Sequence, residues 1–140
     1  TVVGWRKEAA KCLRAVPVNA ENIIMMDAAG LTSKVLDWLE QNKRYFRAAN
    51  AAVVMGNYTR AAENFRKDGS ENEGARILER NKQFDLAIQL YKEAGNLQKA
   101  ATILERLKQY EQAAQLWQRL GNPQRQQACL KKIKHKQLPL

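Results

Sequence analysis

Apolar residues of the chain recur at helical spacing and form stripes that end at glycine. The clearest stripe has the i, i+3, i+4, i+7 spacing of one helix face and consists of Phe84, Ala87, Ile88, Tyr91 and Ala94. It ends at Gly95, and glycine readily adopts the left-handed conformation that stops a helix. The pattern therefore predicts an amphipathic helix followed by a tight turn.

This stripe belongs to a repeat of 26 residues. Residues 73–98 and 99–124 align without a gap and are identical at 13 of 26 positions. Gly69, Gly95 and Gly121 keep the same interval. A period of roughly 20–50 residues is typical of stacked repeat arrays, in which a neighbouring unit covers the apolar face of each unit.

Each repeat is expected to be a short helix, a tight turn and a second helix. The first helices are expected at 75–81 and 101–107. Residues 47–72 form a third, divergent repeat with its second helix at 58–67. Upstream, helices are expected at 5–15, 22–29 and 33–42, with Thr32 as the N-cap of the last. Pro123 fits the first turn of a final helix that includes residues 125–134.

The predicted fold is all-α, a right-handed α-solenoid of about ten short helices in antiparallel hairpins. It is expected to be a single helical-repeat domain, 1–140, with divergent N-terminal helices at 1–46, repeats at 47–72, 73–98 and 99–124, and a C-terminal helix with a basic tail at 125–140. Because the first residue is Thr1 and not methionine, we expect a fragment of a larger protein.

Small and aromatic residues occupy fixed columns of the repeat. Alanine recurs at Ala61, Ala87 and Ala113, and again at Ala75 and Ala101, which allows helices to approach to roughly 8–10 Å. Two aromatic columns are expected to fill the core: Tyr58, Phe84 and Tyr110 in one, and Phe65, Tyr91 and Trp117 in the other.

Residues 82–95 and the matching segment 109–117 resemble the second helix of tetratricopeptide-type repeats. The resemblance covers residues 47 to about 134. The period of 26 is shorter than the usual length of about 34, and the closing proline is missing, which is similar to the short-helix solenoids of coatomer-like and intraflagellar-transport-like trafficking proteins. The resemblance implies a protein-interaction scaffold, usually inside a larger chain, and does not identify its partner.

The formal net charge is +10, and no acidic residue follows Glu111. Such asymmetry favours acidic surfaces, phosphates or anionic peptides as partners, although a merely solvated surface is an open alternative.

The candidate partner-binding residues form a basic ladder, because stacking brings equivalent positions into line. Its members are Arg80, Arg106 and Lys132 in one column, Lys82, Lys108 and Lys134 in the next, and Arg76. An acidic peptide is the expected partner, because arginine binds carboxylates bidentately. The alternative is that Glu79 and Glu105 pair with Lys82 and Lys108 at i, i+3 and neutralise part of the ladder.

Other classes of function have little support in the sequence. A single histidine, His135, and two distant cysteines, Cys12 and Cys129, offer no metal-binding spacing, and no phosphate loop or nucleophile–base pair is recognisable. We therefore expect no cofactor, no metal and no enzymatic activity. Reduced thiols and the lack of a long apolar run favour an intracellular, cytoplasmic protein without a membrane span.

Two alternatives to a protein-binding scaffold stay open. A basic nucleic-acid-binding or helicase-accessory module would use the positive charge. An oligomerisation domain would use the exposed ends of a solenoid and could form a homo-oligomer.

Overall fold

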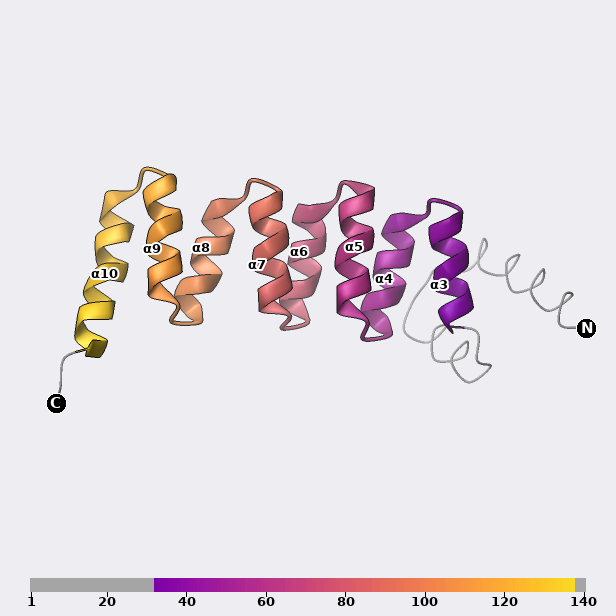
Figure 1. The fold of residues 1–140 in the computed structure, drawn as a ribbon, viewed down its shortest axis with the longest axis horizontal. Helices are drawn as coiled ribbons and strands as arrows, with labels where there is room; N and C mark the ends of the chain where they lie inside the picture. The colour runs from indigo at the N-terminus through magenta and orange to yellow at the C-terminus, as the bar shows by residue number, and fades with distance from the viewer. Residues whose placement is uncertain (1–31, 138–140) are drawn as a thin grey trace, which may run out of the picture. The chain divides into compact units, whose positions relative to one another are not determined.

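The computed structural model describes residues 32–137, and every regular element in this range is an α-helix (Figure 1). The helices expected at 5–15 and 22–29 lie outside the described residues. The chain divides into two compact units, Thr1–Ser70 and Glu71–Leu140, which we describe separately. The all-α prediction is confirmed for the described part of the chain.

Unit 1 contains α3 (Thr32–Gln41), α4 (Tyr45–Val54) and α5 (Tyr58–Asp68). Unit 2 contains α6 (Glu71–Arg80), α7 (Phe84–Glu93), α8 (Leu97–Arg106), α9 (Tyr110–Arg119) and α10 (Pro123–Gln137). The sequence placed the starts of α6 and α8 four residues too late, because their first turns are mainly polar. Thr32 is the first residue of α3 and not its N-cap, whereas Pro123 opens α10 as expected.

Consecutive helices begin 13 residues apart, from Thr32 through Tyr45 and Tyr58 to Pro123. The 26-residue repeat of the sequence is therefore a pair of helices that share one backbone geometry. Helices α3 to α9 are ten or eleven residues long, or about 15 Å. In unit 2 their direction alternates, and the α6–α7 and α8–α9 turns lie at the same end, at the bottom of Figure 1.

One turn geometry produces this register. A single left-handed residue follows each helix from α3 to α9, with φ between 58° and 80°: Lys43, Gly56, Gly69, Lys82, Gly95, Lys108 and Gly121. At the α6–α7 turn, the Lys82 N–H donates to the Glu79 carbonyl at 3.0 Å and the Gln83 N–H donates to the Leu78 carbonyl at 2.9 Å. This pair of bonds is the Schellman motif, and it recurs at all seven turns.

The residue after the left-handed position is also the N-cap of the next helix. The side-chain oxygens of Asn57, Asn96 and Asn122 accept hydrogen bonds from the backbone N–H three residues further on, at 3.1–3.4 Å. Because one residue closes a helix and caps the next, three residues suffice to reverse the chain.

The alanine columns are buried as predicted, with no exposed surface at Ala61, Ala75, Ala87, Ala101 and Ala113. The two aromatic columns differ. Phe65, Tyr91 and Trp117 are at most 3% exposed and lie in the cores of their units. Tyr58, Phe84 and Tyr110 open their helices and are only half-buried, so the prediction that both columns are core is wrong for this one.

Lysine at a left-handed turn position carries a conformational cost that glycine avoids. The φ of Lys82 is 61°, and the φ of Lys108 is 62°. We expect Lys82→Gly and Lys108→Gly each to raise the free energy of unfolding by roughly 0.5–1 kcal/mol, measured by urea denaturation. The control is Lys99→Gly, an exposed position within α8, where the same change should lower it by about 1 kcal/mol. Destabilisation at all three positions would contradict the inference that lysine is strained at the turn positions.

Candidate interaction surface

A recurring glutamate decides which basic residues are available to a partner. Glu40, Glu79 and Glu105 are each the ninth residue of their helices, α3, α6 and α8. Their side chains are only 22%, 23% and 25% exposed. Partly buried carboxylates require hydrogen-bond donors, and helices later in the chain supply them.

Glu105 has the largest set of donors. Its Oε1 accepts from the Trp117 Nε1 at 2.6 Å and from the Cys129 Sγ at 3.2 Å, while Arg125 lies 3.8 Å from Oε2. The indole belongs to α9, and the thiol and guanidinium belong to α10. One carboxylate from α8 thus links two successive helices.

Glu79 occupies the same position one repeat earlier. Its Oε1 accepts from the Tyr91 hydroxyl at 2.9 Å, and its Oε2 accepts from Arg106 at 3.1 Å. In unit 1, Glu40 accepts from Arg60 at 2.6 Å and more weakly from Asn64 at 3.4 Å. A partly buried glutamate that accepts from later helices is therefore common to α3, α6 and α8. It was not recognised in the sequence, although glutamate at 79 and 105 was visible in the repeat.

These contacts correct the expected i, i+3 pairs. Glu79 pairs with Arg106, and Glu105 pairs with Arg125, instead of with Lys82 and Lys108. The reason is geometric: both lysines lie beyond the helix ends, in left-handed turns, so the helical i, i+3 relation does not apply to them.

Cations also lie over the half-buried aromatic rings. Arg106 is 5.9 Å from the Phe84 ring centroid, and Lys132 is 5.2 Å from that of Tyr110. In unit 1, Lys67 is 5.8 Å from the centroid of Tyr45. In each case, the first residue of one helix meets the tenth residue of the next. Two members of the first ladder column, Arg106 and Lys132, therefore contribute to contacts between helices.

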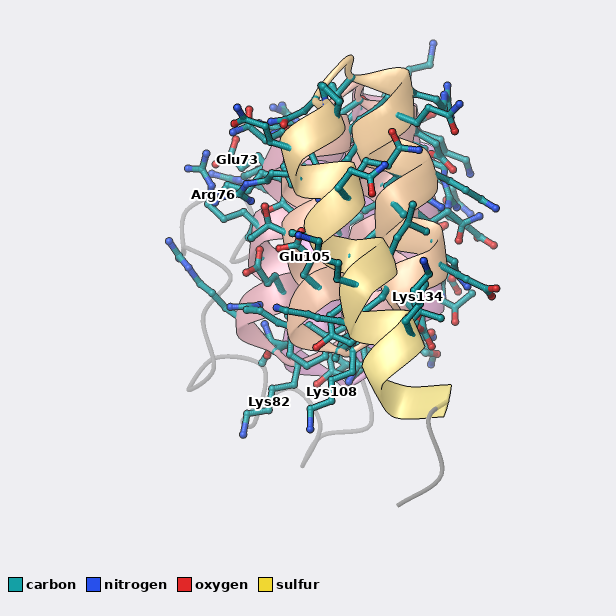
Figure 2. The ribbon with its side chains drawn as sticks, turned by 90° about the vertical axis from the view of Figure 1, so that its left-hand side faces the viewer. Glu73, Arg76, Lys82, Glu105, Lys108 and Lys134 are labelled. Carbon is teal, nitrogen blue, oxygen red and sulfur yellow. The ribbon has the colours of Figure 1, made fainter. Side chains whose placement is uncertain are left out.

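The second ladder column is split. Lys82 and Lys108 are exposed and project from the same end of unit 2 (Figure 2), where they make no ion pair with any described residue. Lys134 lies away from them, because α10 continues to Gln137 and does not turn at the equivalent position. Arg80 and Arg76 are exposed, and Arg76 lies beside Glu73. The turn lysines and Arg80 are thus exposed ladder members that make no ion pair with a described residue.

A hollow of about 210 Å³ opens between α7 and α9. Its apolar part is formed by Ile88 and Leu104, which are 6% and 1% exposed. The hollow is not apparent from the sequence, because the 26-residue repeat does not show which helices flank a gap. Gln109, which follows Lys108 directly, lines the hollow and connects it to the end that carries the turn lysines.

Comparison with protein-family models, with curated proteins and with solved structures finds no match. Within residues 32–137, no helix is long and apolar enough to cross a membrane.

The glutamate contacts predict a measurable loss of stability. Glu105→Ala should lower the free energy of unfolding by about 2–3 kcal/mol, because the Trp117 indole N–H and the Cys129 thiol lose a charged acceptor. Chemical denaturation measures the change. Glu111→Ala, at an exposed position on α9, is the control and should cost less than about 1 kcal/mol. Equal losses in both variants would show that the carboxylate at 105 has no special structural role.

The same contact predicts a pH dependence. Burial, together with the hydrogen bond to Glu105, raises the pKa of the Cys129 thiol from 9.0 to about 11. Folding therefore favours the protonated thiol, so this contribution to stability is complete below pH 9 and is lost as the pH rises toward 11. Between pH 8 and pH 10, the wild-type protein should lose about 1 kcal/mol more unfolding free energy than Cys129→Ala. Identical losses in urea titrations would exclude the linkage.

Proposed function

We propose that this chain is a non-catalytic protein-binding domain of the tetratricopeptide-like helical-repeat class, built as a right-handed α-solenoid. It acts in a larger intracellular, cytoplasmic protein, in a trafficking or transport assembly. The observation that carries the proposal is the fixed 13-residue register, which presents equivalent exposed residues at equivalent places on successive hairpins. Extended surfaces of this kind are suited to binding protein segments.

The distribution of charge supports a particular contact surface. Contacts inside the units use Arg60, Arg106 and Arg125, which bridge the partly buried glutamates. Lys82 and Lys108 remain exposed at one end of unit 2 (Figure 2). An acidic partner is the natural ligand for two unneutralised cations on neighbouring turns.

The test is affinity capture from cell lysate with and without nuclease, with the bound proteins identified by mass spectrometry. We expect a defined protein set that survives nuclease, is retained by the wild-type domain and is lost from Lys82→Glu/Lys108→Glu. The control, Lys99→Glu/Arg119→Glu, has the same change in net charge on exposed residues at the other end of the helices. It should keep the set.

Each alternative has a distinct outcome. Capture that collapses with nuclease would overturn the proposal in favour of nucleic-acid binding, whose affinity also falls steeply with salt. Capture of the same chain alone would indicate oligomerisation. Equal binding by the two charge-reversal variants would remove the turn lysines from the contact surface. Arg106 is unsuitable for such a test, because Arg106→Glu would place a second carboxylate beside that of Glu79.

A further inference from the structure

The hollow between α7 and α9 has the features of a side-chain pocket. Its apolar surface comes from Ile88 on α7 and Leu104 on α8, both buried. Its volume of about 210 Å³ lies below the roughly 300–1,000 Å³ of pockets that enclose a whole small molecule. The space therefore suits one aliphatic side chain, which would add its own burial to the two residues already there.

The rim of the hollow is formed by polar side chains. Gln89 and Lys92 come from α7, and Gln109 and Gln112 come from the start of α9. Among the described residues, none of these side chains has a hydrogen-bond or ion-pair partner. Glutamine amides both donate and accept, so they can pair with the N–H and C=O groups of an extended peptide backbone.

The lining of the hollow carries one positive and one negative side chain, and further positive charge lies on the adjoining turns. Lys92 is in the lining, and Lys82 and Lys108 project from the adjoining turns (Figure 2). Asp85 is the one acidic residue of the lining, and it can accept a backbone N–H. The two turn lysines therefore supply the positive charge that complements an acidic ligand.

We propose that this hollow binds an extended segment of a partner protein, with an aliphatic side chain inserted and acidic residues on either side contacting Lys82, Lys92 and Lys108. The inference rests on the proposed protein-binding function and specifies its ligand. The apolar side chain supplies affinity, and the flanking carboxylates select the segment and fix its position.

Fluorescence anisotropy with a dye-labelled heptapeptide tests the proposal. The probe has leucine at its centre and alternating aspartate and glutamate on both sides, and it is titrated with the whole chain. We expect saturable binding that weakens about tenfold or more when the central leucine is replaced by serine, because the inserted side chain is lost. Equal binding of the leucine and serine peptides would overturn the pocket.

Two variants locate the contact. Gln112→Trp should abolish binding by filling the hollow, whereas Gln115→Trp, exposed on the same helix outside the lining, should preserve it. Lys82→Gln/Lys108→Gln should weaken binding several-fold, and Lys99→Gln should not. Circular dichroism checks that each variant keeps its helicity. Undiminished binding by Gln112→Trp would place the peptide elsewhere and overturn the assignment.

The proposal and the broader function fail in different ways. If no acidic peptide binds while nuclease-resistant capture of a protein set persists, the pocket assignment is wrong and the protein-binding function stands. If capture collapses with nuclease and the peptide also fails to bind, both are wrong. Peptide binding that persists with the serine probe and disappears in moderate salt would show charge attraction alone, which also overturns the pocket.

Discussion

The left-handed turn is the constraint on which the rest of this structure depends. Each of the seven turns closes one helix with a Schellman pair of hydrogen bonds and places the N-cap of the next helix immediately afterwards. This leaves no freedom in loop length, so helices begin every 13 residues and equivalent side chains occupy equivalent sites. The partly buried glutamates and the cation–aromatic contacts recur in both units because this register repeats.

The glutamate contacts show how such short helices are held together. A ten-residue helix has little stability alone, so packing against neighbouring helices must supply most of its stability. Alanine lets the helix backbones approach closely, but each alanine buries little area. Larger aromatic side chains therefore fill the remaining space between the helices. Tyr91 and Trp117 fill that space, and Glu79 and Glu105 satisfy their polar atoms. Packing and polar satisfaction are therefore coupled at the same positions.

Much of the fold could be predicted from the sequence, because glycine at 69, 95 and 121 marks the turns after α5, α7 and α9, and the alanine and aromatic columns mark the buried faces. The 13-residue half-repeat was not apparent, because Lys82 and Lys108 occupy turn positions where glycine is expected. Nothing in a lysine indicates a positive φ. The partners of Glu79 were equally hidden, because Arg106 lies a whole repeat further along the chain and Lys82 lies closer in sequence.

The set of candidate binding residues also differs between the sequence-based prediction and the structure. From sequence alone, every basic residue of a column is equivalent, and Arg106 and Lys132 count as much as Lys82 and Lys108. In the structure, Arg106 and Lys132 each lie over the aromatic ring that opens the preceding helix, so these two cations are partly committed to the fold. A turn lysine has no such neighbour and keeps its charge for solvent or a ligand. The contacts that each cation makes, more than total charge, therefore separate the cations that hold the helices together from those that can recognise a partner.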